Sequence, residues 1–296
     1  MKIEDYFIIA NPISGNGKAK NLIHKLTADL DNQNKTYKVI TTKYPGHAKK
    51  ICQTLQDYEK IIIIGGDGTF NEVINGIMLN NNKPTIGFFP GGTGNAMMHD
   101  LNGTTYNKAL DIVLSNQKKK IDVMKLDLNK RTEYSINIVG WGMAADINIL
   151  SEKLRFLGPP RYTISSIYYI LNKKYRKAKL QIDGKETIDN YLFILTLNTI
   201  HTGKGMKAAP KAKLNDGLID IIILKSSISK LELISLLPKI FSGNHITSNK
   251  IEYIQAKKIN IIPEKNEILN IDGEMKCSTP VNISIIPQII EIFSTN

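Results

Sequence analysis

The chain has 296 residues, of which 42% are hydrophobic and 22% charged, as in an ordinary soluble globular protein, and this length allows two domains of roughly 100–200 residues each. Only two cysteines occur, Cys52 and Cys277, which argues against a disulfide scaffold or a cysteine zinc site and fits a reducing cytosol. The net charge of +12 indicates an anionic partner: nucleotide phosphates, an acidic membrane surface or nucleic acid.

The first third of the chain alternates between strand-like and helix-like segments. Four β-branched residues in a row, Ile61–Ile64, predict a buried strand. This alternation predicts an N-terminal doubly wound parallel α/β domain over residues 1–121, with its Gly-rich turns at one end. The other expected strands are Tyr6–Ala10, Tyr37–Thr42 and Thr85–Phe89, and the expected helices are Ala19–Leu30, His47–Tyr58, Phe70–Leu79 and one after Asn95.

After residue 121 the pattern changes to short alternating segments, which are typical of an antiparallel β-sandwich. We expect this second domain to span residues 122–285, and residues 286–296 to form a C-terminal tail that packs back on the first domain. Helices are expected to interrupt the strands at Tyr162–Lys174 and Lys230–Phe241. The expected strands are Ile121–Leu128, Tyr134–Gly140, Lys179–Ile182, Tyr191–Asn198, Leu218–Leu224, Ile259–Ile262, Ile268–Ile271 and Val281–Ile286.

The N-terminal residues lack the pattern of an export signal. Glu4 and Asp5 stand where a signal peptide would be apolar, so the chain up to Ala10 is expected to lead into the first strand. No run approaches the roughly 20 apolar residues of a membrane-spanning helix. We therefore expect a cytoplasmic protein that would associate with a membrane only peripherally.

Three Gly-rich turns follow predicted parallel strands and surround one acid, Asp67. Turns without Cβ atoms that open a helix expose backbone N–H groups and the positive end of the helix dipole, which suits phosphate. Any single turn is equally well explained as a tight connection without a ligand. Three at one sheet edge, with a lone acid, favour a phosphotransferase, although none is a Walker loop. The turn residues are Asn11, Ser14, Gly15 and Gly17; Gly65, Gly66 and Gly68; and Gly92, Thr93, Gly94 and Asn95.

Together these motifs resemble a known family, the lipid kinases that group diacylglycerol, sphingosine and ceramide kinases with their bacterial relatives. The resemblance covers nearly the whole chain. It implies a nucleotide-binding α/β domain followed by a β-sandwich lipid domain, with ATP as phosphoryl donor and Mg²⁺ to neutralise charge. The motifs that carry it are Asn11–Gly17, Gly46–Ala48, Gly65–Val73, Gly92–Asn95, Met206–Pro210, Asn215–Leu218 and Asp272–Glu274.

The resemblance implies a role for each matching residue. Asp67 would accept or orient the proton of the attacking lipid hydroxyl. The three turns, with Thr41 or Thr42, would line the nucleotide pocket. Asp272 and Glu274 would lie beside it, near the metal or the ribose; a simple hairpin turn is the alternative explanation of Asp-Gly-Glu. Asp216 matches a position that binds a structural Mg²⁺ in some bacterial members, and it is equally well explained as a turn acid.

Residues 140–162 resemble sphingosine and ceramide kinases more than plain bacterial diacylglycerol kinases. Arg155 and Arg161 match contacts to nucleotide phosphates, which rigid guanidinium groups suit; a solvated basic face is the alternative. Asn148 departs from the pattern, because sphingosine kinases carry there an acid expected to pair with the lipid amine. An amide gives no charge to an ammonium group, so a neutral lipid fits this chain. Asp146 and Glu152 are the other residues expected near the lipid head.

The predicted helix Tyr162–Lys174 is apolar along one side and ends in the basic run Lys173–Lys177. Ile164, Ile167 and Tyr168 would form a lid that admits an acyl chain, with the basic residues against an anionic membrane. An ordinary amphipathic helix with a charged end explains the same pattern equally well.

The sequence thus predicts an ATP- and Mg²⁺-dependent lipid kinase that phosphorylates a primary hydroxyl of a sphingoid base, ceramide or diacylglycerol. The alternatives are a phosphotransferase of the NAD kinase type and a non-catalytic lipid-binding protein on the same fold. Nucleic acid is not expected as a partner, because the basic charge is dispersed and no recognition motif accompanies it. A homodimer is an oligomeric state that the sequence leaves open.

Overall fold

The computed structural model of the chain describes residues 4–56, 58–129, 131–158, 160–203 and 205–295. Its contacts divide the chain into two compact units. Unit 1 consists of Met1–Val123, Gly203–Gly205 and Pro287–Asn296, and unit 2 consists of Met124–Thr202 and Met206–Ile286. Within the described residues no helix is long and apolar enough to cross a bilayer.

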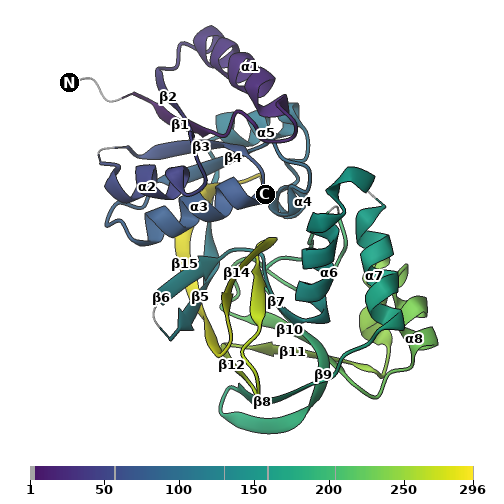
Figure 1. The fold of residues 1–296 in the computed structure, drawn as a ribbon. Helices are drawn as coiled ribbons and strands as arrows, with labels where there is room; N and C mark the ends of the chain where they lie inside the picture. Colours follow the sequence, from purple (N-terminus) through teal and green to yellow (C-terminus); the bar gives the residue numbers. More distant parts are fainter. Residues whose placement is uncertain (1–3, 57, 130, 159, 204, 296) are drawn as a thin grey trace. The chain divides into compact units, whose positions relative to one another are not determined.

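Unit 1 is built on a parallel sheet in which β1 lies between β2 and β3, and β3 pairs with β4 (Figure 1). The sheet forms here because its strands are almost wholly apolar: Ile61–Ile64 and Ile8–Ala10 have no solvent exposure. The predicted doubly wound architecture is confirmed. The strands are β1 (Tyr6–Ala10), β2 (Tyr37–Thr41), β3 (Lys60–Gly65) and β4 (Thr85–Pro90).

Helices cover both faces of this sheet (Figure 1). On one face α1 (Lys18–Asn32) meets α5 (Tyr106–Leu114), where the Tyr106 hydroxyl donates to Asp29 at 2.5 Å. On the other face α2 (His47–Thr54) packs closely on α3 (Asp67–Met78); a Cβ at Gly76 would lie 2.4 Å from the Lys49 carbonyl oxygen. The short helix α4 (Ala96–Asp100) follows the third Gly-rich turn.

Two strands have residues in both units: β5 (Lys118–Leu128) and β15 (Val281–Phe293). Of the residues expected to form a C-terminal tail, 286–293 are the second half of β15. In unit 1, Ile292 pairs in parallel with Ile86 of β4, and the Gln288 N–H donates to Asp122 at 2.7 Å.

Unit 2 is antiparallel, as predicted, with strand order β14-β13-β7-β9-β8-β12-β15 and with β10 and β11 joined through β9. The 13-residue strand β9 pairs with β8 along its first half and with β7 and β10 along its second. Trp141, Tyr191 and Ile221 are among the side chains of the core that the strands enclose. The strands are β6 (Arg131–Ser135), β7 (Ile138–Gly142), β8 (Arg176–Ile182), β9 (Lys185–Leu197), β10 (Ile219–Lys225), β11 (Ile251–Ala256), β12 (Lys258–Pro263), β13 (Ile268–Ile271) and β14 (Glu274–Ser278).

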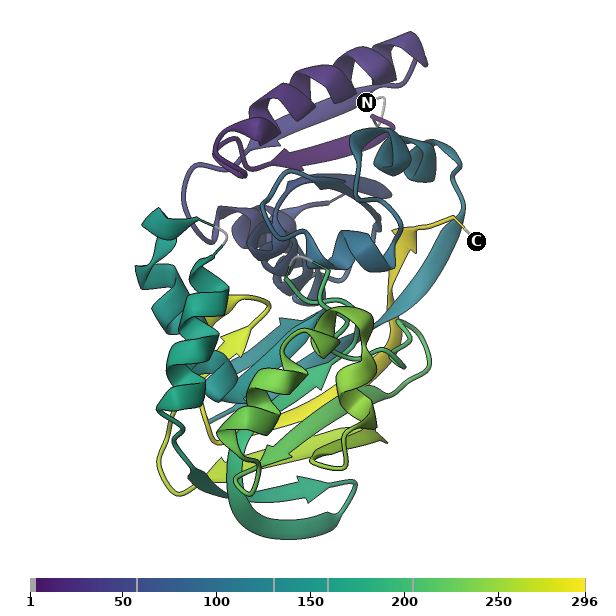
Figure 2. The same cartoon turned by 90° about the vertical axis from the view of Figure 1, so that its right-hand side faces the viewer.

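The helices of unit 2 lie together outside these strands (Figure 2). They are α6 (Met143–Lys153), η1 (Arg155–Leu157), α7 (Arg161–Leu171), α8 (Lys230–Leu236), α9 (Lys239–Ser242) and η2 (Asn244–Thr247). Met143, Ile170 and Leu233 of α6, α7 and α8 share one buried apolar cluster with Leu192 and Leu224 of β9 and β10.

Two predicted elements of unit 2 were wrong in detail. The expected strand Tyr134–Gly140 is broken at residues 136–137, because the Asp272 carboxylate accepts hydrogen bonds from backbone N–H groups there. The expected helix Lys230–Phe241 is two helices, because Pro238 has no N–H to donate to the preceding turn. Helices α5 and α6 and strands β6, β11 and β14 were not predicted as separate elements.

Candidate active site

The three Gly-rich turns of unit 1 pack directly on one another at the carboxyl ends of the strands. A Cβ at Gly15 would lie 2.4 Å from the Gly91 carbonyl oxygen, so the first and third turns are in contact. A Cβ at Gly92 would lie 2.4 Å from the Gly66 Cα, which joins the third turn to the second. These approaches are possible only without side chains, which is why the sequence has glycine here.

Two asparagines hold the turns in shape. The Asn95 side chain accepts from the Gly92 N–H and donates to the Gly92 carbonyl, both at 2.9 Å. Asn11 donates to the Thr69 hydroxyl at 3.2 Å and accepts from the Ile13 N–H at 3.3 Å. Both amides therefore shape the backbone of their turns, and their direct contact with a nucleotide stays a prediction.

Asp67, the first residue of α3, lies between the second and third turns and is half-buried. Its Oδ1 accepts the Ala96 N–H, at the start of α4, at 2.8 Å. Its Oδ2 lies 2.8 Å from where a Cβ of Gly94 would be, so Gly94 leaves the space that this oxygen needs. The carboxylate is thus fixed in orientation at the junction of two Gly-rich turns.

The other predicted nucleotide residues of unit 1 lie in or next to these turns. Ser14 approaches Gly66, with its hydroxyl 3.5 Å from a Cβ placed there, and Thr93 is exposed. Gly17 is the uncapped N-cap of α1, with φ +87°. Thr41 ends β2 and is exposed, and the Thr42 N–H donates to the Ala10 carbonyl at 2.8 Å. Gly65 ends β3, and Gly68 lies in the first turn of α3.

Two contributors to this edge were missed by the sequence analysis. The loop Gly203–Gly205 is surrounded in sequence by unit 2 but belongs to unit 1. A Cβ at Gly205 would lie 3.4 Å from the His99 ring, and one at Gly94 would lie 3.9 Å from the Gly203 carbonyl oxygen. The only signal was the two glycines, which an ordinary turn explains equally well. The second contributor is Glu72, whose carboxylate accepts the Gly46 and Ala48 N–H groups at 2.7 and 3.1 Å and so caps α2.

Asp272, in unit 2, is a buried carboxylate that accepts hydrogen bonds from one turn. It is 5% exposed and accepts four hydrogen bonds, from the Ser135 hydroxyl and from the N–H groups of residues 136, 137 and 138. Asp272 and Gly273, at φ +49° and +91°, form the hairpin turn between β13 and β14. Glu274 lies 3.2 Å from Lys276. The hairpin alternative is therefore what the structure contains, and the expected contact of this pair with the nucleotide or metal stays a prediction.

The arginines and acids of the α6–α7 region pair with one another. Glu152 accepts from Arg155 at 2.5 Å and from Arg161 at 3.4 Å. Asp146 accepts from Arg176 at 2.6 Å, with both side chains largely buried. The predicted phosphate contacts of Arg155 and Arg161 stay a prediction, since in this structure both guanidinium groups lie against Glu152.

Asn148 is buried and donates to the Gly273 carbonyl at 3.0 Å, which joins α6 to the β13–β14 turn. The predicted lipid-contacting residues of α7 lie on its outer side: Ile164, Ile167 and Tyr168 are 44%, 42% and 51% exposed. These positions are open to an apolar partner, whereas the Asn148 amide is engaged within the fold.

Asp216 is exposed, and its Oδ1 accepts the Leu218 N–H at 3.1 Å, as a turn acid does. Four residues on, Asp220 is fully buried, and its Oδ1 accepts from the Tyr253 hydroxyl and the Gln255 amide at 2.5 and 3.1 Å. Its Oδ2 has no hydrogen-bond partner. Burial raises the pKa of Asp220 to about 6. The predicted metal role of Asp216 stays a prediction.

The resemblance implies Mg²⁺, so we asked whether the carboxylates of the candidate site suit this ion. Across the described residues no three His, Cys, Asp or Glu side chains come together as a preformed metal cage. Mg²⁺ usually takes one or two carboxylates and completes its shell with water and substrate phosphates. Asp67 beside the turns meets that requirement, so Mg²⁺ fits as an ion brought with the nucleotide.

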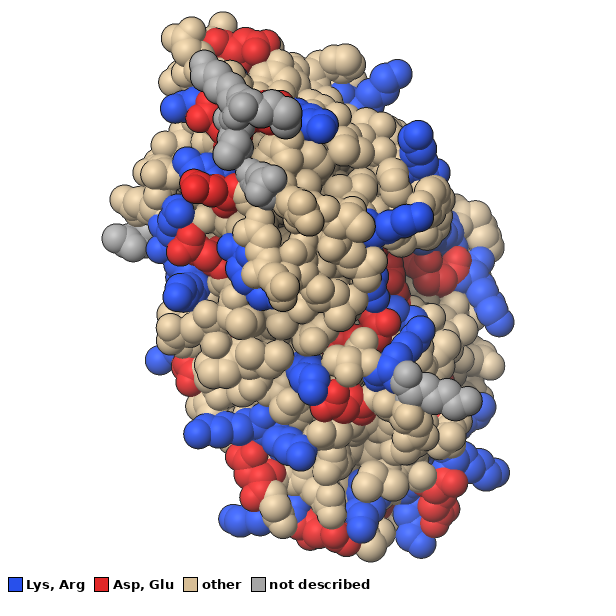
Figure 3. All heavy atoms as spheres, turned by 90° about the vertical axis from the view of Figure 1, so that its left-hand side faces the viewer, with Lys and Arg blue, Asp and Glu red and all other residues tan. Residues whose placement is uncertain are grey.

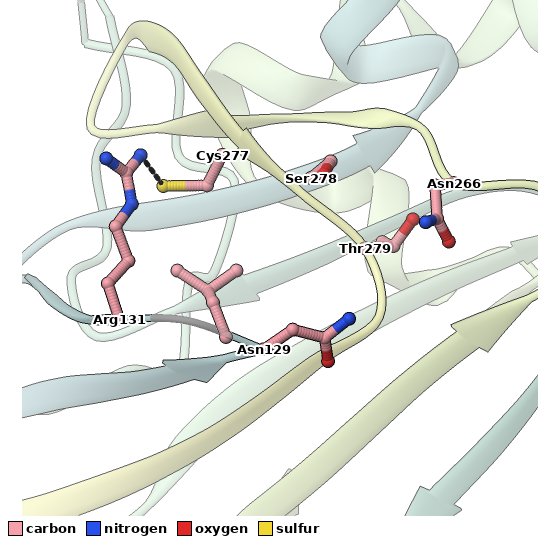
Figure 4. Close-up of a pocket in the computed structure, with 7 residues that line it drawn as sticks. Asn129, Arg131, Asn266, Cys277, Ser278 and Thr279 are labelled. Atoms are coloured by element: carbon pink, nitrogen blue, oxygen red, sulfur yellow. Dashed lines mark hydrogen bonds between the residues drawn. The ribbon is translucent and has the colours of Figure 1, made fainter.

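Unit 2 also contains a cavity of about 350 Å³, shown in Figure 4. Arg131 and Cys277 face each other on one side of it, 2.7 Å apart from Nη2 to Sγ, and Asn266 and Thr279 lie on the other side. None of the predicted site residues lines this cavity. It therefore adds nothing to the site predicted from the sequence.

The fold and the turns define a class: a doubly wound domain with Gly-rich turns around one aspartate, joined to an antiparallel β-sandwich. Residues 5–126 match the diacylglycerol kinase catalytic domain, and residues 137–294 match the YegS C-terminal NAD kinase beta sandwich-like domain. The chain therefore belongs to the diacylglycerol kinase family of lipid kinases, whose phosphoryl acceptor is an alcohol.

Individual relatives agree with this. A diacylglycerol kinase of Staphylococcus carnosus is 30% identical, with 97% of this chain and 94% of that protein covered. One of Bacillus subtilis is 29% identical, with 90% and 88% covered. The crystal structure of a diacylglycerol kinase from Bacillus anthracis matches with TM-score 0.80 at 25% identity, covering 100% and 98% of the two chains. An NAD kinase from Archaeoglobus fulgidus in complex with ATP shares the fold alone, with TM-score 0.51 at 14% identity and 98% and 93% coverage.

Proposed function

We propose that the protein transfers the γ-phosphoryl group of ATP to a primary hydroxyl of a neutral membrane lipid, with diacylglycerol or ceramide as acceptor. The observation that carries the proposal is the placement of Asp67. Its Oδ1 is fixed by the Ala96 N–H, and Gly94 leaves the space that its Oδ2 needs. A carboxylate held in this way beside phosphate-type turns is suited to receive the proton of an attacking hydroxyl.

The turns supply the donor side of the reaction. The N-terminus of α1 has no side-chain cap, and its first-turn N–H groups donate to the carbonyls of Ser14, Gly15 and Gly17, so the helix offers a phosphate the positive end of its dipole. Contacts at the Gly15–Gly91 and Gly66–Gly92 junctions hold the three turns rigidly together. Such a rigid set of donors holds the phosphates in line with the acceptor without reorganisation. Mg²⁺, when bound with ATP, would neutralise charge on the transferred phosphoryl group.

The charges on α6 favour a neutral acceptor. A sphingoid base carries an ammonium group, which would need an acid to receive it. Asp146 is already paired with Arg176, Glu152 with Arg155 and Arg161, and Asn148 has no charge. An ammonium group would therefore have to displace a guanidinium group from a strong pair, whereas diacylglycerol or ceramide would not. The relatives named diacylglycerol kinase agree with this choice.

The test is a lipid panel with the Asp67→Asn variant. The wild-type protein, with Mg²⁺ and labelled ATP, is expected to phosphorylate diacylglycerol or ceramide in mixed micelles, and sphingosine and NAD at least ~10-fold less. Asp67→Asn is expected to lower kcat by about 10²–10⁴-fold, because the proton acceptor is lost, and to change the affinity for Mg²⁺ and nucleotide by a smaller factor.

Asn95→Asp is a matched control that changes a carboxamide of the same edge without touching Asp67, and its effect on nucleotide affinity is expected to exceed its effect on kcat. Full turnover by Asp67→Asn would contradict the role of Asp67. Phosphorylation of NAD in preference to every lipid would assign the protein to the alternative class.

A further inference from the structure

Large apolar side chains are exposed mainly in one part of unit 2. Seventeen such side chains are exposed among the described residues, and eleven of them fall within residues 156–175 and 231–241. Single exposed apolar residues are normal, but a concentration of this kind on one face marks a binding surface. The eleven are Phe156, Leu157, Tyr162, Ile164, Ile167, Tyr168, Leu171, Tyr175, Leu231, Ile234 and Phe241.

Helix α7 exposes a row of large apolar side chains to solvent. The exposed positions Ile164, Ile167, Tyr168 and Leu171 follow the i, i+3, i+4, i+7 spacing of a single helix face. The opposite face buries Ile170 together with Ser165, whose fully buried hydroxyl has no hydrogen-bond partner. A helix that only covered a core would place these two faces the other way round.

Helices α8 and α9 extend this face. α8 begins at a capping box between Ser229 and Glu232 and buries Leu233, while Leu231 and Ile234 are 80% and 42% exposed. Phe241 in α9 is 57% exposed. α7 and α8 lie side by side in Figures 1 and 2 and share one buried cluster. Lys173 donates to the Ile228 carbonyl and so ties the end of α7 to the segment before α8.

Basic side chains outnumber acids in the segments that form this face. Residues 161–177 contain five Lys or Arg and no acid; Arg161, Arg176 and Lys177 pair with acids of other segments, and Lys173 and Lys174 follow the apolar stripe at the end of α7. Residues 228–242 contain Lys230, Lys239 and a single acid, Glu232, which caps α8. Lys174, Lys230 and Lys239 are exposed. On the face drawn in Figure 3, by contrast, basic and acidic side chains alternate.

We propose that α7, α8 and α9 together form a docking surface for an anionic lipid bilayer, in which Leu231, Ile234 and Phe241 insert beside α7 and the lysines contact the lipid head groups. Exposed tyrosines such as Tyr168 and Tyr175 suit the boundary between head groups and acyl chains. A second copy of the chain fits this surface less well, because self-association would bring like-charged lysines together. The inference rests on the proposed function in one respect, that the acceptor is a membrane lipid.

The test measures vesicle binding without ATP, so that it is independent of catalysis. Wild-type protein is expected to cosediment with vesicles of phosphatidylcholine containing anionic phosphatidylglycerol, and to bind less at 0.5 M than at about 0.05 M salt, because salt screens the lysines. The triple variant Leu231→Ser, Ile234→Ser, Phe241→Ser is expected to bind at least ~30-fold more weakly, since three inserting side chains are lost.

The chain offers a matched control on the strands of unit 2. Ile188, Ile262 and Ile268 are 61%, 38% and 40% exposed, so serine at all three removes comparable apolar surface elsewhere. This control is expected to bind as the wild type does. Thermal melting and phosphorylation of a short-chain, dispersed diacylglycerol would show that both variants fold and react.

Three outcomes would overturn the inference. The first is equal vesicle binding by the α8–α9 variant and the wild type. The second is equal weakening in both triple variants. The third is sedimentation equilibrium in which the α8–α9 variant loses a dimer that the wild type and control keep, which would assign the face to a second copy. Absence of lipid phosphorylation with intact vesicle binding would instead count against the proposed function alone.

Discussion

Two Asp-Gly dipeptides, Asp67-Gly68 in unit 1 and Asp272-Gly273 in unit 2, look alike in sequence but have different environments. Asp67 begins a helix and is half-buried between glycine turns that leave room beside it. Asp272 is nearly inaccessible and accepts four hydrogen bonds from one turn. Burial and the space beside a carboxylate, neither of which the motif specifies, therefore separate the environments of these two acids.

The largest effect is expected from Asp272→Asn. Asparagine tolerates the left-handed backbone at this position, but its NH₂ group cannot accept the Ile136 N–H, and the remaining bonds lose their charge. We expect a loss of about 4 kcal/mol in unfolding free energy, measured by urea denaturation. The KM for ATP of the folded fraction is expected to stay unchanged. If Asp272→Asn were as stable as the wild type but bound ATP more weakly, Asp272 would belong to the nucleotide site, and the comparison with Asp67 would fail.

A third carboxylate, Asp220, sharpens the comparison because it is buried with few donors. Its pKa of about 6 lies above the unfolded value, so the folded state holds the proton more tightly. The protonated Asp220 side chain should therefore contribute its full stabilisation below about pH 4. This contribution to the unfolding free energy, about 3 kcal/mol in total, should be lost as the pH rises to about 6. Denaturation of wild type and Asp220→Asn between pH 4 and 7 checks this.

Asp220→Asn has no titrating group at this position. The unfolding free energy of the wild type should therefore fall relative to that of the variant between about pH 4 and 6, and the difference should then level off. A constant difference from pH 4 to 7 would show that Asp220 is already ionised in the folded protein.

A smaller effect is expected from Gly94→Ala, which tests the space beside Asp67. The new Cβ would lie 2.8 Å from the Asp67 Oδ2 and would displace the carboxylate. We expect kcat to fall about 100-fold, or about 2.7 kcal/mol in the activation barrier, with little change in melting temperature. Gly140→Ala in β7 is the control, since its Cβ would have no contact closer than 3.4 Å. Equal kcat in both variants would mean that the position of Asp67 is not critical.

Much of unit 1 could be predicted because its signals are local. The run Ile61–Ile64 and the glycines after it fix a buried strand and a tight turn within ten residues. The same reasoning missed the loop Gly203–Gly205, because its place beside His99 depends on contacts between residues about 100 positions apart.

The prediction of unit 2 was also limited by contacts between residues that are distant in sequence. The strand pattern predicted a β-sandwich, but the break at residues 136–137 is set by Asp272, far along the chain. The pairing of Glu152 with Arg155 and Arg161 also needs coordinates, since a basic stretch alone suggests a phosphate contact as readily as an ion pair.

The composition of unit 1 has a consequence for how the chain can fold during synthesis. In its sheet, strand β4 pairs with β15 on the side away from β3, and the unit also includes the loop at residues 203–205. A nascent chain released only to Val123 would leave the edge of β4 unpaired and open to other strands. Unit 1 is therefore completed only when residues 287–293 emerge from the ribosome, and a fragment cut after Val123 should aggregate rather than fold alone.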